Sequence, residues 1–254
     1  MLNRGLKIMT QSLKILYEDA DIIVCIKPPG TASETKRSGQ QDMVSLIRNY
    51  RYQKGEEPYA GLIHRLDQPV EGILVFGKHA AASAALSRQL AQGNFSKIYL
   101  AVTEGNMPDN QGRLCDFLKK DSRSNTSRVV PEREPQAKKA ELLYQVLKTD
   151  AEQIPVHNLV RIQLLTGRHH QIRVQMAHSG TPLFGDRKYG GFKDLQKNPK
   201  ESGLGLCACE LAFAHPVTDK ALKFQIYPSQ PVFQKFAKYF PAKDREISRS
   251  MNIF

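Results

Sequence analysis

The chain has 254 residues, and 41% of them are hydrophobic, which is enough to fold around a core and excludes a disordered chain. Lysine and arginine number 37 against 25 aspartates and glutamates, a formal net charge of +12. Such an excess on a folded chain favours a polyanionic partner such as nucleic acid. No apolar run approaches the roughly 18 residues needed to cross a bilayer, so we expect no membrane contact.

The cysteines and the N-terminus predict a cytoplasmic protein. The one close cysteine pair, Cys207 and Cys209, is spaced C-x-C and lacks the C-x2-C spacing of a zinc knuckle or redox site. The opening residues MLNRGLKIMTQSLK contain no sustained apolar segment and no small-residue cleavage site, so we expect no secretion signal. Reduced thiols are the expected state of such cysteines.

The N-terminal half of the chain predicts short strands interleaved with helices. Asp42–Tyr52 has the apolar spacing of an amphipathic helix, and Ala80–Gln92 is predicted to be a second helix that ends at Gly93. Runs rich in β-branched and other apolar residues predict strands at 15–17, 22–27, 73–76 and 97–102.

The C-terminal half predicts further strands around one polar segment. Lys119–Lys139 is basic and poor in apolar residues, and is predicted to be a mobile loop. Gln171–His178 has apolar residues at a period of two between flanking glycines, which leaves both helix and strand open. Strands are expected at 140–148, 159–165, 206–213 and 221–227, and a closing helix at 232–240.

Short strands outnumber helices in this prediction, and few of them are joined by a helix. We therefore expect an α+β fold with a mixed, largely antiparallel sheet flanked by helices and loops. With no repeat and no clear linker, residues 13–240 are expected to form a single catalytic domain of two lobes. Tails are expected at 1–12 and 241–254, with no separate N-terminal RNA-binding domain.

One isolated carboxylate stands in the segment His64-Arg65-Leu66-Asp67. The cationic neighbours would keep Asp67 ionised, and a loop that enters a strand is a common place for a catalytic group. Three hypotheses stay open: an ion-paired loop residue, a nucleophile or base, and half of a hydrolase pair with Glu71. Pro69 and Gly72 argue against the helix that would bring the two carboxylates face to face.

Two further segments carry candidate site residues. A glycine-containing turn is predicted to present Arg168 and Arg173 to an anion, either an RNA phosphate or the Asp67 carboxylate. Adjacent histidines in this segment would face opposite sides of a strand and chelate poorly, so we expect no metal site. Lys97 and Tyr99 share one face of a predicted strand, where the tyrosine is either half-buried packing or a stacking and proton-transfer group.

Taken together, these segments resemble the RluA-type pseudouridine synthases. The motifs that match, in family order, are KPPG at 27–30, HRLD at 64–67, KIY at 97–99, TGRHHQIRV at 166–174, GDRKYG at 185–190 and ACELAFAHP at 208–216. The match covers about residues 13–230. The chain departs from the family pattern at Val70-Glu71, where Thr-Ser is usual, at His169, where a small polar residue is usual, and at Cys207, where a histidine is common.

The resemblance implies a pseudouridine-synthase-like fold with a central RNA-binding cleft, acting on ribosomal or transfer RNA as a monomer without cofactor or metal. It implies that Asp67 is the essential carboxylate, that Tyr99 stacks on the target base and helps to remove its C5 proton, and that Arg173 pairs with Asp67. The residues expected to contact RNA or substrate are Arg65 (supporting base flipping), His64, Arg168, Lys27, Lys97 and His170.

Two alternatives remain at this point. One is an RNA-binding or assembly factor that uses this scaffold without catalysis, and the other is a nucleoside hydrolase that uses Asp67 and Glu71. Because a second negative charge beside Asp67 would be unfavourable, we expect Glu71 to point away from it or to be neutralised by a basic neighbour.

Overall fold

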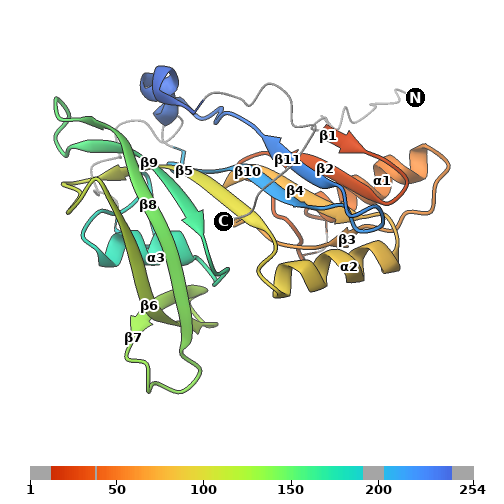
Figure 1. Cartoon of the computed structure of the whole chain (residues 1–254), viewed down its shortest axis with the longest axis horizontal. Helices are drawn as coiled ribbons and strands as arrows, with labels where there is room; N and C mark the ends of the chain where they lie inside the picture. Colours follow the sequence, from red (N-terminus) through yellow and green to blue (C-terminus); the bar gives the residue numbers. More distant parts are fainter. Residues whose placement is uncertain (1–12, 38, 191–202, 242–254) are drawn as a thin grey trace, which may run out of the picture.

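The computed structural model describes residues 13–37, 39–190 and 203–241 (Figure 1). The expected tails, 1–12 and 241–254, lie outside the described residues except for residue 241. The strands are β1 Lys14–Glu18, β2 Ile22–Lys27, β3 Gly61–Leu62, β4 Glu71–Gly77, β5 Ser96–Glu104, β6 Gln111–Asp121, β7 Thr126–Val130, β8 Lys138–Asp150, β9 His157–Leu164, β10 Leu206–Ala214 and β11 Ala221–Gln225. The helices are α1 Met43–Gln53, α2 Ala80–Ala91, α3 Gln171–His178 and the 3₁₀ helix η2 Pro231–Tyr239.

All described strands belong to one sheet, in the order β1-β2-β4-β10-β5-β9-β8-β6-β7, with β3 beside β4 and β11 beside β10. Among the strands of the described ranges, β4 and β10 form the single parallel pair, and every other pair of strands is antiparallel. The predicted α+β class with a mixed, largely antiparallel sheet is therefore confirmed. No helix among these residues is long and apolar enough to cross a membrane.

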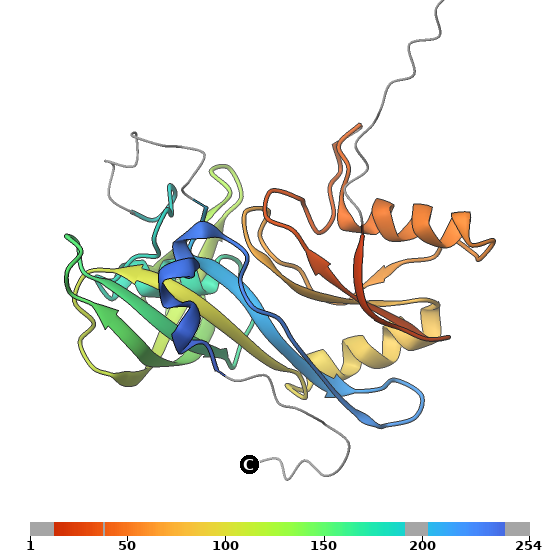
Figure 2. The ribbon, with the colours of Figure 1, turned by 90° about the horizontal axis from the view of Figure 1, so that it is seen from above.

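Alternation along the central strands divides the core between the two faces of the sheet. Figure 2 shows α1 and α2 on opposite sides of the strands that lie between them. On β5, Tyr99 and Ala101 face the side covered by α1 and α3, whose buried residues join the same cluster. Ile98 and Leu100 face the opposite side, where α2 and η2 contribute to a second cluster. Tyr99 thus lies on the face from which α3 approaches.

Helix α1 begins where the sequence predicted, because its first turn is capped from both directions. The Asp42 carboxylate accepts the Ser45 backbone N–H at 2.8 Å, and the Ser45 hydroxyl accepts the Asp42 N–H at 3.1 Å. This reciprocal capping box satisfies donors that the helix itself leaves unpaired. It fixes the helix just beyond the loop that follows β2.

The prediction of a mobile loop at Lys119–Lys139 is wrong. About half of this segment lies in the end of β6, in β7 and in the start of β8, and the rest forms the two turns that join these strands into a long antiparallel arm. Leu118 and Ala140, which flank the segment, are buried against Val174 of α3, and Val130 within the segment is buried as well. Composition misled because a strand at a sheet edge tolerates, and often requires, charged residues along its length.

The segment left open between helix and strand, Gln171–His178, is α3. Its residues face the arm on one side and the central sheet on the other, so most of its side chains are buried. Burial on several sides removes the amphipathic spacing by which a surface helix is recognised.

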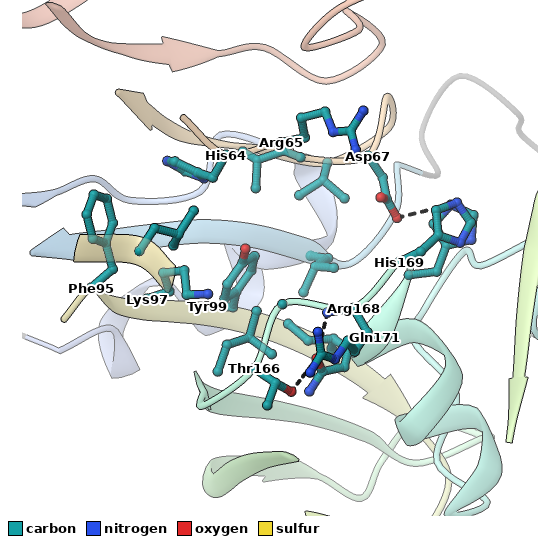
Figure 3. Close-up of a pocket in the computed structure, with 18 of the residues that line it drawn as sticks. His64, Arg65, Asp67, Phe95, Lys97, Tyr99, Thr166, Arg168, His169 and Gln171 are labelled. Carbon is teal, nitrogen blue, oxygen red and sulfur yellow. Dashed lines mark hydrogen bonds and ion pairs between the residues drawn. The ribbon is translucent and has the colours of Figure 1, made fainter. Parts of the chain in front are cut away.

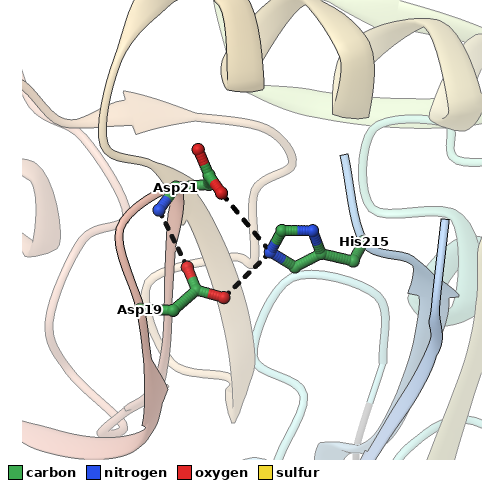
Figure 4. Close-up of side chains that lie close together, drawn as sticks. All are labelled: Asp19, Asp21 and His215. Carbon is green, nitrogen blue, oxygen red and sulfur yellow. Dashed lines mark hydrogen bonds and ion pairs between the residues drawn. The ribbon is translucent and has the colours of Figure 1, made fainter. Parts of the chain in front are cut away.

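The hairpins β1–β2 and β10–β11 are joined by a cluster of Asp19, Asp21 and His215 (Figure 4). His215 Nε2 lies 2.8 Å from Asp19 Oδ2, while its Nδ1 accepts the Thr218 backbone N–H at 3.1 Å. Since Nδ1 accepts this N–H, Nε2 is the ring nitrogen that donates to Asp19. These three side chains form a hydrogen-bonded link between the β1–β2 turn and the β10–β11 turn.

Candidate active site

Asp67 lies in the loop between β3 and β4, and its side chain is 24% exposed. The Val70 N–H donates to the Asp67 carbonyl at 3.0 Å, which closes a tight turn around Pro69. One residue earlier, Leu66 is held on both sides by Ser33, whose hydroxyl accepts the Leu66 N–H at 3.0 Å and donates to its carbonyl at 2.9 Å. The backbone on each side of the carboxylate is therefore fixed.

Lys27 holds the same loop from beneath. Its side chain is fully buried, and Nζ donates to the carbonyls of Pro28 at 3.0 Å, Thr31 at 2.6 Å and Gln68 at 3.0 Å. Burial lowers its pKa to about 8, against the opposing effect of the Asp67 and Glu71 carboxylates. All three ammonium protons are used, so the geometry supports a role for Lys27 in shaping the loop and not the RNA contact expected from sequence.

Arg173 of α3 reaches Asp67 from across the cleft. Its Nη1 donates to Asp67 Oδ2 at 3.1 Å, while Nε and Nη2 donate to the two carboxylate oxygens of Asp186 at 2.7 Å each. The guanidinium also lies over the Tyr189 ring, 5.2 Å from its centroid. The bidentate pair with the fully buried Asp186 orients the guanidinium and so orients Asp67.

His170 is the second group beside the carboxylate, with Nε2 3.6 Å from Asp67 Oδ2. Tyr189 Oη accepts the Ser127 N–H at 2.7 Å and lies 2.6 Å from His170 Nδ1, so it donates its own proton to that nitrogen. Burial lowers the pKa of His170 to about 4. The ring is therefore neutral, with its proton on the nitrogen that faces Asp67.

The backbone of His170 is unusual for its residue type. Its φ of 54° places it in the left-handed region, at the residue that precedes the first turn of α3. This conformation is held by the contacts of the histidine with Tyr189 and by stacking on His169, whose ring centroid lies 3.7 Å away. Backbone strain of this kind is typical of functional sites.

Tyr99 forms the wall of the cleft between Lys97 and Asp67 (Figure 3). It is 8% exposed. Burial and the nearby Asp67 carboxylate both raise its pKa, so the hydroxyl is protonated at neutral pH. A buried aromatic ring with a neutral hydroxyl is suited to holding a flat, partly polar ring such as a nucleobase.

The remaining predicted site residues also line this cleft. Arg65 is exposed at its mouth, and Arg168 is tied by its Nε to the Lys139 carbonyl at 2.8 Å. At the far end, burial and the neighbouring Arg168 lower the pKa of Lys97. His64 Nε2 is buried there without a hydrogen-bond partner among the described residues, and burial, with Lys97 nearby, lowers its pKa to about 3. This end of the cleft is cationic, while the carboxylate lies at the other.

Glu71 does not share the cleft with Asp67. Its Oε2 accepts the Ser229 N–H at 2.9 Å, and its Oε1 accepts the Ser229 hydroxyl at 2.7 Å. The prediction that Glu71 points away from Asp67 is confirmed. With the two carboxylates engaged by different partners, the paired-carboxylate hypothesis loses its geometric basis.

Sequence reasoning did not assign roles to two residues that complete the site. Asp186 and Tyr189 were matched only as members of a motif, yet one orients Arg173 and the other fixes the tautomer of His170. The signal was present in the spacing of GDRKYG, but the partners come from α3, and only the fold brings them together.

A family model described as RNA pseudouridylate synthase matches residues 21–178. The chain belongs to this family. An uncharacterised RNA pseudouridine synthase of Bacillus subtilis (strain 168) is 34% identical over 211 residues, which cover 83% of this chain and 67% of the relative. The ribosomal large subunit pseudouridine synthase D of Vibrio cholerae is 36% identical over 223 residues, covering 84% of this chain and 66% of the relative. The chain thus spans about two thirds of the length of these relatives.

The fold is also found in solved structures. Human RNA pseudouridylate synthase domain containing 1 superposes with a TM-score of 0.68 at 22% identity, over 85% of this chain and 84% of the human one. This likeness confirms the predicted fold. The family assignment confirms the predicted resemblance and the expected class of enzyme, an RNA pseudouridine synthase.

Proposed function

We propose that this chain converts uridine in RNA to pseudouridine and that Asp67 is the carboxylate that acts on the target nucleotide. The observation that carries the proposal is the Asp67–Arg173 ion pair in a cleft that also holds Tyr99 and His170. In the reaction the C1′–N1 bond breaks, the uracil turns, C5 bonds to C1′, and the C5 proton is lost while N1 gains one. No water is added, so one carboxylate is sufficient.

The surroundings of Asp67 favour its acting as an anion. Arg173 supplies the opposite charge, and His170 presents a neutral N–H at 3.6 Å, too long for a strong hydrogen bond. Both of these contacts involve Oδ2, and Oδ1 accepts no hydrogen bond from the described residues. We infer that Oδ1 is the oxygen directed at the target nucleotide.

Tyr99 supports the target base with its ring in this proposal. Its raised pKa keeps the hydroxyl protonated, so it cannot simply take up the C5 proton. In this proposal it receives the C5 proton as it passes its own proton to the nearby Asp67 carboxylate.

The cations of the cleft take the RNA backbone. Arg65 at the mouth is placed to occupy the space that a flipped base vacates, which offsets part of the stacking energy lost, a few kcal/mol. Lys97 and Arg168, at the opposite end from Asp67, are placed to bind a flanking phosphate, with the neutral His64 beside them. No step requires Lys27 to touch RNA.

We propose the large-subunit ribosomal RNA as substrate, in preference to transfer RNA, because relatives from several organisms are named as ribosomal large subunit pseudouridine synthases. The proposal places the chain in the compartment where ribosomes are made. It also treats the chain as a monomer, since Asp67, Tyr99 and Arg173 all come from one chain.

The test is turnover of an unmodified transcript of large-subunit ribosomal RNA that carries tritium at uridine C5. Formation of pseudouridine releases the tritium, a nucleoside hydrolase releases free uracil, and a non-catalytic binding protein releases neither. We expect tritium release without uracil. We expect Asp67→Asn to reduce the rate by about a thousandfold or more while RNA affinity stays within about threefold, because many other contacts hold the RNA. Normal turnover by this variant would refute the role of Asp67.

A further inference from the structure

His169, one of the three departures from the family pattern, lies where the β6–β7 hairpin meets the start of α3. Both of its ring nitrogens are engaged by that hairpin: Nδ1 lies 2.9 Å from Ser127 Oγ, and Nε2 lies 3.2 Å from Asn125 Oδ1. A neutral imidazole has one donor and one acceptor, so Nε2–H donates to the Asn125 oxygen and Nδ1 accepts the Ser127 hydroxyl. Burial and the neighbouring Lys120 lower the pKa of His169, which favours this neutral form.

Further contacts hold the hairpin in this position. Lys188 Nζ donates to the Asn125 carbonyl at 2.8 Å, and the Ser127 N–H donates to Tyr189 Oη at 2.7 Å. Asn125 has a left-handed backbone, with φ at 49°, which asparagine tolerates better than most residues and which closes the turn between the two strands. Ser127 is buried, so its hydrogen bonds are shielded from water. The hairpin is therefore fixed to the segment that follows α3.

His169 connects this fixed hairpin to His170. The two rings stack, with their centroids 3.7 Å apart and their planes inclined by 25°. His170 in turn directs Nε2 at Asp67 Oδ2. Its Nδ1 receives the Tyr189 proton, because the Tyr189 oxygen already accepts the Ser127 N–H. The hairpin thus acts on His170 by two routes, the stacked His169 ring and the Tyr189 hydroxyl.

We propose that His169 is a positioning residue: held by the β6–β7 hairpin, it fixes the ring of His170 beside Asp67. The proposal rests on the proposed function of Asp67. A small polar side chain in place of His169 would have no ring face to set against His170, so this link depends on the aromatic residue that the chain has here. It gives the arm a part in the chemical step in addition to contact with RNA.

The first experiment follows the His170 ring and requires no turnover. In protein labelled with ¹⁵N in its histidine rings, NMR distinguishes the ring nitrogen that carries the proton from the one that accepts, and the His170 signals are identified by their loss in His170→Ala. The variants are His169→Ala and His169→Gln, which keeps a donor and an acceptor for the hairpin and lacks the ring. His178→Ala, exposed at the end of the same helix, is the matched control.

We expect wild-type His170 to show one fixed tautomer. Both His169 variants should move its two nitrogen shifts toward the averaged values of a ring that exchanges between tautomers. On the ribosomal transcript, kcat should fall about tenfold in both variants, the size of a typical coupling between residues in contact, with KM within about twofold. His178→Ala should change neither the spectrum nor kcat.

A double-mutant cycle tests whether His169 acts through His170. In a His170→Ala background, His169→Ala should change kcat by less than about twofold. Ser127→Ala removes the hydroxyl and keeps the backbone N–H that Tyr189 accepts. It should lower kcat by about threefold in the wild type and by no more in the His169→Ala background, because the hydroxyl acts through His169.

An unchanged His170 spectrum in His169→Gln, the milder variant, would overturn the positioning role. Additive losses of kcat for His169→Ala and His170→Ala would overturn it as well, because a general loss of stability would act independently of His170. Additive losses for Ser127→Ala and His169→Ala would overturn the part assigned to the hairpin. If Asp67→Asn is fully active while the His170 spectrum changes as expected, the proposed function fails and the positioning of His170 stands by itself.

Discussion

The Arg173 guanidinium is shared between two carboxylates, and this sharing determines how the charged residues of the site are oriented. The buried Asp186 takes Nε and Nη2, which leaves Nη1 for the more exposed Asp67. Around this pair, Tyr99, His64 and His170 are all neutral at physiological pH because burial penalises their charged forms. Charge in the centre of the cleft is therefore concentrated on Asp67 and Arg173.

The histidines predict how activity responds to acid. The pKa values of His64 and His170 are lowered to about 3 and about 4, so both rings stay deprotonated as the pH falls from neutral. We expect kcat to be flat between about pH 5 and 7, the range in which an unperturbed histidine would titrate. Single-turnover rates on the ribosomal transcript check this. An acidic limb near the ordinary histidine pKa that disappears in His170→Gln would contradict it.

The hydroxyl of Tyr99 has a separate test. Tyr99→Phe keeps the ring and removes the hydroxyl for which we propose proton transfer, so kcat should fall about a hundredfold while KM changes little. Tyr99→Leu is the matched control for the ring, and loss of stacking should weaken binding of the target by about 1–3 kcal/mol. A wild-type rate in Tyr99→Phe would exclude proton transfer through the hydroxyl.

At the scale of elements, α3 is the part that assembles the site. His170, the left-handed residue just before the helix, and Arg173, in its first turn, both reach Asp67 in the loop before β4. The loop itself is held by Lys27 at the end of β2 and by Ser33. Two separately anchored elements thus meet at Asp67.

The anchor of α3 predicts a cost in stability. Asp186→Ala leaves the buried Arg173 with only one ionic partner, and removing one member of a buried pair typically costs about 3–5 kcal/mol. We expect the free energy of unfolding in urea to fall by an amount of this order and kcat to fall with it. Asp121→Ala, at the exposed end of β6, is the control and should change stability by less than about 1 kcal/mol.

Basic residues of the molecule lie on the arm formed by β6, β7 and the start of β8 and at the rim of the cleft, as well as at its centre. Lys120 of β6 is exposed and lines the cleft, although it lies far along the chain from Asp67. β1 and β7 lie at opposite ends of the strand order. We expect RNA affinity to fall steeply with salt because binding releases counterions from the phosphates.

The contribution of the arm is measurable from that dependence. Lys120→Ala should weaken RNA binding and reduce the slope of log affinity against log salt concentration by about 1, the value for one lost phosphate contact. Lys14→Ala, on the distant β1, changes the net charge equally and should leave the slope unchanged. Equal effects of the two variants would mean that net charge matters and the arm does not.

By itself the sequence predicted the fold class and most strand and helix positions, and it singled out Asp67, Tyr99 and Arg173, which the structure brings into one cleft. Alternation at a period of two, capping residues and ordered motifs are local patterns, and local patterns survive without knowledge of the fold. They failed where burial came from several sides or where charge lay on an edge strand, as in α3 and the β6–β7 arm.

Only the tertiary structure decided what each charged group faces. Lys27 has the sequence appearance of an RNA contact, yet its ammonium is enclosed by three carbonyls. Glu71 has that of a second catalytic carboxylate, yet it binds Ser229 at the far end of the chain. The role of a charged group depends on its neighbours in space and on their exclusion of water, and those neighbours come from elements that are distant in sequence.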